Sequence, residues 1–506
     1  MSSKKLSTAA HSISKATSPA SCLVNIDNMN NHVKNVEYAI RGEINTKAMS
    51  LSKQLKSRSG TLPFEKIYQC NIGNPQVLEQ KPLSFVRQVT SLMLNPDILD
   101  IVPKGTFPED VIARAKKHMK STPSMGAYTE SKGLPSVRDE ICEFLEKRDG
   151  VKGDPNTLFL TNGASEAAKL FLSCIMRSKD AGYNDGLMAP IPQYPIYSAL
   201  TSMYNGTLIP YFLDEDKDWG LNAGAIEKSL DDAATQGVTV RAIVVINPGN
   251  PTGQILGKDN IQEIIDICRK KELCLIADEV YQENVYRKDA EFVSFRKAAY
   301  EMNAFDTSSG QPSLQLLSMH STSKGFIGEC GLRGGYMELL GFPEDVSAMI
   351  YKISSLALCS NTIGQVAMGC MVNPPAEGDE SYTTYITEKN NILDSLKRRA
   401  TKLNDALNQL EGVNCNQASG AMYCFPNIVL PQGAYEAALE KGKTPDEMYC
   451  MELLENTGIV TVPGKGFGQA EGTLHIRFTI LPPEKDMDMI VERITKFHEN
   501  FLKKYA

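Results

Sequence analysis

Short apolar runs recur through the middle of the chain, and helical patterns separate several of them. Each run is too short to form a helix of its own. One of the separating segments is 260–272, where Ile261, Ile264, Ile265 and Cys268 share one helical face. Alternation of strands and helices, with strands this apolar, predicts a largely parallel sheet that is buried on both faces. The predicted strands are 157–161, 186–192, 208–213, 242–248, 273–280, 314–320 and 335–340.

The pattern changes on both sides of this region. The segment before residue 121 is helical with turns, whereas a polar stretch from about 374 leads to a long charged helical segment and then to alternating segments. With 506 residues, the chain exceeds one ordinary hydrophobic core. We therefore predict a large α/β domain with a mainly parallel seven-stranded sheet, and a smaller α+β domain built from both chain ends. The predicted divisions are a disordered polar tail at 1–34, an N-terminal arm and part of the small domain at 35–120, the large domain at 121–373, and the rest of the small domain at 374–506.

Composition narrows the function classes only a little. Hydrophobic residues make up 42% of the chain and charged residues 22%, which is ordinary for a globular protein. The formal net charge of -7 argues against nucleic acid as the main partner, because a phosphate-binding surface needs concentrated Lys and Arg. None of the apolar runs approaches the roughly 20 residues of a membrane-spanning helix. We therefore expect neither nucleic acid nor membrane as a partner.

Cysteine and histidine spacing gives no sign of a metal site. The 12 cysteines form no CxxC pair, and several lie in apolar stretches, which is typical of small buried side chains in a reducing compartment. The six histidines form no cluster with the spacing of metal ligands, so we expect no metal.

The first 26 residues contain no Asp or Glu and many Ser, as mitochondrial transit peptides do. However, the first arginine is Arg41, which favours a disordered polar tail instead. We therefore expect a cytoplasmic protein, with the mitochondrial matrix as the alternative.

The candidate chemistry lies at the ends of the predicted strands. Ligands of open parallel sheets bind at the carboxyl ends of the strands. After the first strand, "TNGASEAAK" begins a helix whose free N–H groups favour a phosphate. The fourth, fifth and sixth strands end next to an amide, a carboxylate with a phenol, and a lysine. The residues concerned are Ala164 and Ser165, Asn250, Asp278 and Tyr281, and Ser321 and Lys324.

These groups suit an aldehyde cofactor that carries a phosphate and a ring nitrogen. A lysine amine with a depressed pKa can form a Schiff base, and a carboxylate keeps a pyridine nitrogen protonated. Ser321 and Arg333 can hold a phosphate. Lys132 repeats the "SKG" triplet of Lys324, but it follows no predicted strand, so we do not expect it to be the reactive lysine.

Several longer blocks carry a family resemblance. The sequence resembles the class I pyridoxal-phosphate aminotransferases, and within them the alanine aminotransferase subfamily, over about residues 35–506. The blocks are "CNIGNPQ" (70–76), "GAYTESKG" (126–133), "PIPQYPIYSA" (190–199), "INPGNPTG" (246–253), "DEVYQEN" (278–284), "HSTSKGFIGECGLRGGYME" (320–338) and "VPGKGFGQ" (462–469).

The resemblance implies fold type I of the pyridoxal-phosphate-dependent transferases and a set of residue roles. The implied catalytic residues are Lys324, as Schiff-base lysine and proton shuttle, Asp278, which pairs with the pyridine nitrogen, and Tyr194, which stacks on the ring. The implied pyridoxal 5′-phosphate ligands are Ala164, Ser165, Tyr194, Asn250, Asp278, Tyr281, Ser321, Lys324 and Arg333, together with Tyr128 from the neighbouring subunit of a homodimer. The implied substrate ligands are Gly73, Asn250 and Arg477.

The reaction implied by the resemblance is ping-pong transfer of an amino group from L-alanine to 2-oxoglutarate. Four alternatives remain at this stage, one of which is a paralogue that binds the cofactor but turns over alanine poorly. A glutamate:glyoxylate aminotransferase shares the same motifs, and a lyase or synthase can use the same fold. A non-enzymic cofactor-binding regulator is disfavoured, because the leading segment is short and lacks a helix-turn-helix pattern.

Overall fold

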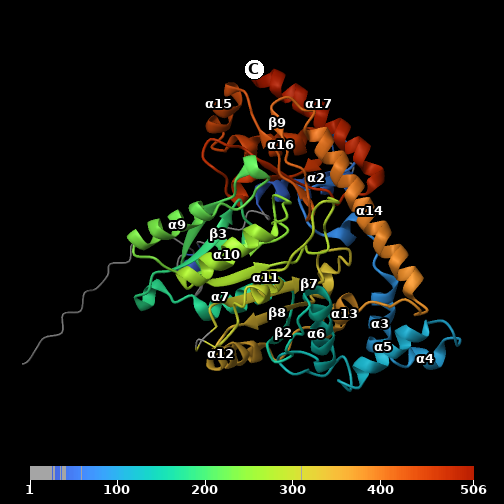
Figure 1. Cartoon of the computed structure of the whole chain (residues 1–506). Coiled ribbons are helices and arrows are strands. Elements are labelled where there is room, and N and C mark those ends of the chain that lie inside the picture. Colours follow the sequence, from blue (N-terminus) through green and yellow to red (C-terminus); the bar gives the residue numbers. More distant parts are fainter. Residues whose placement is uncertain are drawn as a thin grey trace, which may run out of the picture.

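The computed structural model describes residues 25–26, 29–34, 36, 42–57, 60–308, 310 and 312–506. Figure 1 shows a larger lower part built around a sheet and a smaller upper part, where the C-terminal segment lies beside α2 from near the N-terminus. Most of the predicted tail at 1–34 lies outside the described residues. Within that range, α1 forms one helical turn, and His32 Nε2 lies 2.9 Å from Asp180 Oδ2.

One seven-stranded sheet forms the centre of the larger part, with the strand order β2-β8-β7-β6-β5-β3-β4. β8 runs antiparallel to both of its neighbours, and the other adjacent strands are parallel. The strands coincide with the seven apolar runs, which confirms the predicted mainly parallel sheet. Their bounds are β2 (Leu158–Thr161), β3 (Asp185–Ile191), β4 (Thr207–Phe212), β5 (Thr239–Ile246), β6 (Cys274–Asp278), β7 (Gln315–Ser321) and β8 (Gly335–Leu340).

Helices cover both faces of the sheet, because alternate side chains of each strand point to opposite sides. In β5, Ile243 and Val245 pack with α9, α10 and α11, whereas Val244 and Ile246 pack with α7, α8 and α12. The bounds of these helices are α7 (Ala164–Ile175), α8 (Ile196–Met203), α9 (Ala223–Thr235), α10 (Lys258–Lys271), α11 (Phe295–Glu301) and α12 (Glu344–Ser354).

The smaller part joins segments from both ends of the chain. β1 (Tyr68–Gln69) pairs in parallel with β12 (Ile459–Val460), and β14 (Ile476–Thr479) lies between β10 (Tyr423–Cys424) and β13 (Val462–Pro463). Local signals fix the ends of α16: a capping box of Thr444 and Glu447 begins it, and Gly458, at a φ of 75°, ends it. The helices here are α2 (Glu43–Ser57), α15 (Gln432–Glu440), α16 (Pro445–Thr457) and α17 (Met487–Tyr505), and the remaining strands are β9 (Val413–Asn414) and β11 (Asn427–Ile428).

The segment 35–120 divides its packing between the two parts. β1 belongs to the smaller part, whereas Val86 and Val89 of α3 and Val111 of α5 pack in a separate core with α6 and α13. The predicted domain boundaries themselves stay a prediction. The bounds of these helices are α3 (Ser84–Leu94), α4 (Ile98–Ile101), α5 (Glu109–Met119), α6 (Pro135–Asp149) and α13 (Thr362–Val372).

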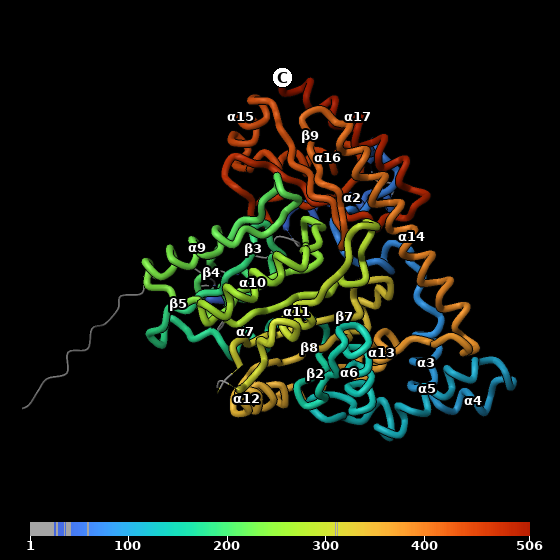
Figure 2. The backbone as a smooth tube through the Cα atoms, viewed as in Figure 1, coloured from blue at the N-terminus to red at the C-terminus, as the bar shows by residue number. Residues whose placement is uncertain are grey.

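A single long helix, α14 (Tyr382–Leu407), connects the two parts (Figure 2). Tyr385, near its beginning, packs with α3 and α13, and Leu396, Leu403 and Leu407 pack in the core of the smaller part. The helix therefore belongs to two hydrophobic cores at once.

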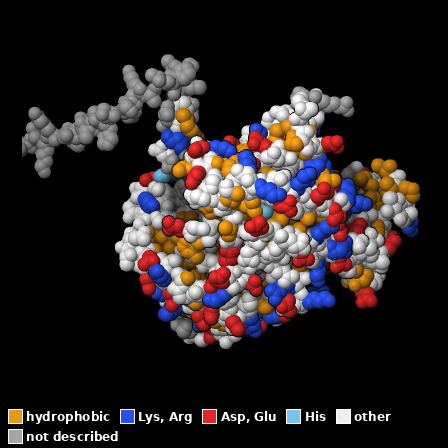
Figure 3. Space-filling view, turned by 90° about the horizontal axis from the view of Figure 1, so that it is seen from above, with side chains coloured by type: hydrophobic (Ala, Val, Ile, Leu, Met, Phe, Trp, Pro, Cys, Tyr) orange, Lys and Arg blue, Asp and Glu red, His pale blue; other side chains and the backbone are white. Residues whose placement is uncertain are grey.

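The surface carries mixed charges. In Figure 3, acidic and basic side chains alternate over the visible face, with no large area of one sign. This face therefore offers no concentrated basic surface for nucleic acid. None of the helices in the described part of the chain is both long enough and apolar enough to cross a membrane.

Candidate active site

A cavity of about 510 Å³ lies at the carboxyl ends of the parallel strands, where the larger and smaller parts meet. Its size is that of a site for a small molecule. All of the residues predicted from the sequence, apart from Tyr128, line this one cavity. They are Gly73, Ala164, Ser165, Tyr194, Asn250, Asp278, Tyr281, Ser321, Lys324, Arg333 and Arg477.

Lys324 follows the last residue of β7 by three positions and is half-buried. Its Nζ donates a hydrogen bond to the carbonyl oxygen of Gly73, at 2.6 Å. Gly73 is needed there, because a Cβ at this position would lie 2.2 Å from Tyr423 Oη and 2.9 Å from Lys324 Nζ. The absence of a side chain at Gly73 thus leaves the amine room in the cavity.

Asp278 is the last residue of β6 and is buried on the side of α7 and α8. Its Oδ2 accepts a hydrogen bond from the Tyr197 hydroxyl at 2.6 Å, whereas its buried Oδ1 has no hydrogen-bond partner. Burial raises the pKa of the Asp278 carboxyl above its usual range, although the Tyr197 hydroxyl and the Lys324 charge oppose the shift. A protonated ring nitrogen placed in the cavity would supply the missing partner for Oδ1, so this carboxylate fits a pyridine cofactor.

The beginning of α7 offers hydrogen-bond donors to an anion. Ala164 and Ser165 form the first turn of this helix, whose unpaired N–H groups favour a negative charge. Arg333 approaches the same point, since a Cβ on Gly163 would lie 2.8 Å from its Nη2. Ser321 also lines the cavity; its Oγ accepts from the backbone N–H of Ser323 at 3.1 Å, and its hydroxyl donates to the Gly334 carbonyl oxygen at 3.2 Å, a bond that it would exchange for one to the phosphate. These donors fit the phosphate of the same cofactor.

Arg477, in β14, is the cation on the side of the smaller part. It is buried, and its guanidinium donates to Asn250 Oδ1 at 3.1 Å through Nη1 and to the Asn71 carbonyl oxygen at 2.6 Å through Nη2. The guanidinium stacks between two aromatic rings, with its Cζ 4.3 Å from the ring centre of Tyr423 and 4.6 Å from that of Phe467. Its buried Nε has no partner. A buried, aromatic-clamped guanidinium with unused donor capacity suits a carboxylate ligand.

Tyr128 is the one predicted residue that the structure does not bring to the cavity. Its side chain is 75% exposed on this chain. The Leu358 carbonyl accepts a hydrogen bond from Ser131 Oγ at 2.7 Å, and the Leu358 side chain is also exposed. The role assigned to Tyr128 requires a second subunit, and it stays a prediction.

Two sequence neighbours of site residues point away from the cavity. Glu279 accepts hydrogen bonds from the Phe295 backbone N–H at 2.8 Å and from Ser318 Oγ at 3.3 Å. His320 stacks on Phe144, with ring centres 6.4 Å apart. Both side chains therefore lie on the face of the sheet opposite to Asp278.

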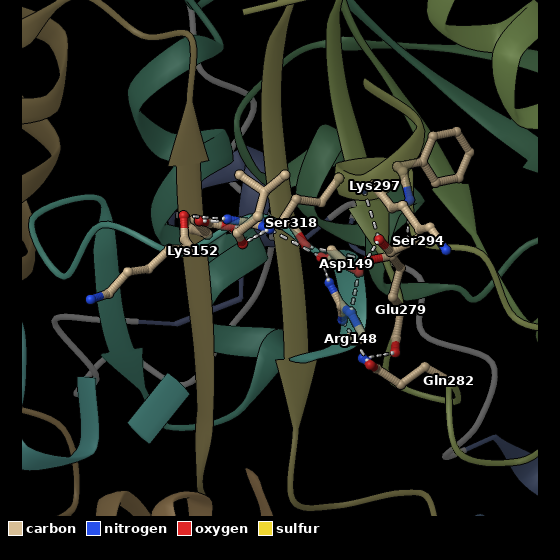
Figure 4. Close-up of polar contacts among 12 residues, drawn as sticks. Arg148, Asp149, Lys152, Glu279, Gln282, Ser294, Lys297 and Ser318 are labelled. Atoms are coloured by element: carbon tan, nitrogen blue, oxygen red, sulfur yellow. Dashed lines mark hydrogen bonds and ion pairs between the residues drawn. The ribbon is translucent and has the colours of Figure 1, made fainter. Parts of the chain in front are cut away.

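A buried charge network occupies that opposite face (Figure 4). Arg148 forms two hydrogen bonds with Asp149, and its Nη1 donates to Gln282 Oε1 at 2.8 Å. Arg296 joins Asp149 to Glu338, at 3.2 and 2.9 Å. Because these groups pair with one another, we assign the network a structural role.

Sequence reasoning missed several residues that line the cavity, among them Tyr197, Tyr423 and Cys330. Tyr197 lies three residues after Tyr194 and so on the same side of the chain, which is a usable signal. Tyr423 is part of "GAMYCFP", where only alternation was visible, and Cys330 gave no signal beyond its nearness to Lys324. Among the described residues, no group of three or more His, Cys, Asp or Glu side chains is arranged to hold a metal ion.

A mostly parallel seven-stranded sheet, with a lysine and a carboxylate at the ends of adjacent strands, defines a transferase of fold type I. The family model "Aminotransferase class I and II" matches residues 102–494. The chain belongs to this family.

The chain is similar to named relatives over nearly its whole length. A protein of Dictyostelium discoideum named "Probable alanine aminotransferase, mitochondrial" is 48% identical over 488 residues, which cover 95% of this chain and 90% of the relative. "Glutamate--glyoxylate aminotransferase 1" of Arabidopsis thaliana is 47% identical, covering 95% of this chain and 96% of its own. The solved structure "Alanine aminotransferase from Pyrococcus furiosus" is 25% identical with a TM-score of 0.72, and it covers 93% of this chain and 99% of its own.

Proposed function

We propose that this enzyme is an alanine aminotransferase that uses pyridoxal 5′-phosphate to move an amino group between L-alanine and 2-oxoglutarate, giving pyruvate and L-glutamate. The observation that carries the proposal is the single cavity in which Lys324, Asp278, the beginning of α7 and Arg477 meet. When bound, the cofactor supplies an aldehyde for the amine and a ring that withdraws electrons.

The side chains of the cavity then have separate tasks. Lys324 Nζ is the amine that would hold the cofactor through its aldehyde carbon, with loss of water, and the free amine would serve as the base at the substrate α-carbon. Asp278 Oδ1 would accept a hydrogen bond from the protonated ring nitrogen, and Tyr197 holds Asp278 in place through Oδ2. Arg477 grips the α-carboxylate that alanine and glutamate share, so the α-carbon is presented in the same place for both.

The cofactor ligands complete this proposal. Ala164, Ser165, Ser321 and Arg333 would hold the phosphate, Tyr194 would cover one face of the ring, and Tyr281 and Asn250 would bind the ring hydroxyl. Each of these residues lines the cavity. The substrate carboxylate also meets the backbone at Gly73.

The reactive lysine can be identified directly. Reduction of the cofactor-loaded enzyme with borohydride, followed by peptide mapping, should place the pyridoxyl label on Lys324. Lys324→Ala should lose turnover and still bind the cofactor without a covalent link. A label on Lys132, which carries the same triplet and lies outside the cavity, would refute the assignment.

The main rival is a glutamate–glyoxylate aminotransferase, which the Arabidopsis relative supports by name. To separate the two, each amino acid should be added alone to the loaded enzyme, and the change in cofactor absorbance followed, with pyruvate and glyoxylate compared as acceptors in the reverse half-reaction. A higher kcat/KM for pyruvate supports the proposal, and a higher kcat/KM for glyoxylate overturns it.

A homodimer is part of the proposal, since Tyr128 would reach the phosphate of the partner's site. Tyr128, Leu356 and Leu358 are exposed large hydrophobic side chains, and each is available for such a contact. Mixing Lys324→Ala chains with Tyr128→Phe chains should restore partial activity, because one site of each mixed dimer would be intact. No recovery in mixed dimers, with Tyr128→Phe inactive by itself, would refute the role of Tyr128.

The relative from Dictyostelium carries the word mitochondrial in its name, which supports the mitochondrial alternative over the cytoplasmic location predicted from the sequence. Fusing residues 1–34 to a fluorescent protein tests this directly. Import into mitochondria is the expected result if the segment is a transit peptide, and a diffuse cytoplasmic signal contradicts it.

A further inference from the structure

The cavity contains a phenol to which the proposed function gives no task. Tyr423, in β10, is buried, and its hydroxyl lies 3.2 Å from the hydroxyl of Tyr281. The two rings meet edge to face, with centres 6.0 Å apart and planes at 81°. The Tyr423 hydroxyl is also confined, because it sits where a Cβ on Gly73 would be. Because its surroundings confine it, the Tyr423 hydroxyl keeps the Tyr281 hydroxyl as its hydrogen-bond partner.

We propose that Tyr423 is a positioning residue that acts through Tyr281: its hydroxyl donates to the Tyr281 oxygen and so turns the Tyr281 proton toward the cofactor. This inference rests on the proposed function, in which Tyr281 binds the ring hydroxyl of the cofactor. The inference adds Tyr423 as a second residue, which orients the Tyr281 hydroxyl for that contact.

The direction of the hydrogen bond follows from the charges around the pair. Four ionisable groups lie around Tyr423. They are Tyr281, which follows β6 in the sequence, Lys324, which follows β7, and also Cys330 and Arg477. The Arg477 guanidinium lies against the Tyr423 ring, 4.3 Å from its centre, and Lys324 Nζ approaches its hydroxyl beside Gly73.

These two cations make the phenols unequal. Burial by itself would raise the pKa of Tyr423, but Lys324 and Arg477 outweigh it and lower that pKa below its ordinary value. Burial raises the pKa of Tyr281 well above its ordinary value. In the cofactor-loaded enzyme Lys324 is joined to the cofactor, and the Arg477 guanidinium, 4.3 Å from the Tyr423 ring centre, remains as the cation beside this phenol. The phenol next to the retained cation is the better donor, so Tyr423 donates and Tyr281 accepts. The Tyr281 proton is then left to point at a different acceptor, which the cofactor's ring hydroxyl provides.

The consequence is a shift that can be measured on the cofactor. A hydrogen bond from Tyr281 stabilises negative charge on the oxygen of the cofactor's ring hydroxyl. This negative charge is greatest when the nitrogen that joins Lys324 to the cofactor is unprotonated. A hydrogen bond from Tyr423 strengthens the donation by Tyr281, because linked hydrogen bonds polarise one another. Removing the Tyr423 hydroxyl should therefore raise the pH at which this nitrogen gives up its proton.

The experiment is a pH titration of the visible absorbance of the cofactor-loaded enzyme, without substrate. Tyr423→Phe keeps the ring under Arg477 and removes only the hydroxyl. We expect its midpoint to rise by about 0.5 to 1 pH unit, the size of one ordinary hydrogen bond. Tyr281→Phe should shift the midpoint further, and the double variant should match Tyr281→Phe alone.

A matched control is Tyr211→Phe. Tyr211 is also buried, and its hydroxyl donates to the Val244 carbonyl at 2.7 Å, but it does not line the cavity. Its variant should titrate like the unchanged enzyme. This control separates the loss of any buried tyrosine hydroxyl from the loss of the one beside Tyr281.

The outcomes separate cleanly. An unchanged midpoint in Tyr423→Phe overturns the inference, and so does an equal shift with and without Tyr281, because Tyr423 would then act on the cofactor independently. If the unchanged enzyme binds no pyridoxal 5′-phosphate, the proposed function fails and this inference fails with it. If the unchanged enzyme titrates normally and only the Tyr423 result is negative, the proposed function stands.

Discussion

Replacing Arg477 with alanine should impair alanine and glutamate to the same degree. The Arg477 guanidinium is buried, held by the Asn250 side chain and the Asn71 backbone, and clamped between two rings. It can hold only the carboxylate that both amino acids carry next to the reacting carbon. A cation dedicated to the glutamate side chain would instead be left unpaired when alanine, with its methyl group, is bound.

The expected size of the loss follows from the burial of this arginine. Removing one partner of a buried, hydrogen-bonded charge pair costs about 3–5 kcal/mol. Since each 1.4 kcal/mol is a factor of ten, kcat/KM should fall by about a hundredfold to several thousandfold for either amino acid. Lysine at this position should recover only part of the loss, because an ammonium cannot form the two parallel bonds of a guanidinium.

The assay follows each half-reaction separately. Alanine or glutamate is added alone to the loaded enzyme in single-turnover experiments, and the cofactor absorbance is recorded. Arg493→Ala is the matched control, because Arg493 also lies in the smaller part and over a tyrosine ring, 5.3 Å from the centre of Tyr68, yet it does not line the cavity. Thermal unfolding of both variants shows whether stability changes alongside activity.

Two results would refute this reasoning. A loss confined to glutamate would mean that Arg477 reads the side-chain carboxylate. An equal fall in activity for Arg493→Ala would mean that the loss arises from damage to the smaller part and not from the cavity.

Three further predictions concern the buried carboxylates. Asp278→Asn should lower kcat by about a hundredfold or more while the Tm changes by only a few degrees, because charge at the ring nitrogen matters most in the transition state; a near-normal kcat would contradict it. Arg296→Ala should lower the free energy of unfolding by about 3–5 kcal/mol in urea melts, since Glu338 would remain buried without its cation. Burial raises the pKa of Glu279 from 4.5 to about 7. The folded state therefore keeps a proton that the unfolded chain gives up, so the free energy of unfolding should fall by about 3 kcal/mol as the pH rises between these values, and Glu279→Gln should remove this fall.

The sheet was predictable because each strand is buried on both faces and therefore reads as an uninterrupted apolar run. The direction of β8 was not predictable from its residues, since "GYMELL" fits an antiparallel and a parallel neighbour equally well. The packing of α3 and α5 against α6 and α13 was also invisible, because an amphipathic helix shows that it has a buried face but not what covers it.

The site was predictable where a strand end fixes the side chain. Asp278 and Ser321 end adjacent strands, and their position alone brings them to one edge of the sheet. Gly73, Arg477 and Tyr128 came from the family resemblance, because they reach the site through contacts distant in sequence. Tyr423 was missed for the same reason: its partner Tyr281 is in another part of the chain, and no local spacing relates them.

The pairing of β1 with β12 has a consequence for biosynthesis. Tyr68 pairs with Ile459, so roughly 390 residues must leave the ribosome between the two partners, which takes about 20 to 80 seconds at ordinary rates of translation. Two residues that line the cavity on this side are similarly far apart in sequence: Gly73 follows β1, and Arg477 lies in β14, beyond β12. The last strand of the seven-stranded sheet, β8, ends at Leu340, so the nascent chain carries the floor of the cavity without Arg477 only in the final part of its synthesis.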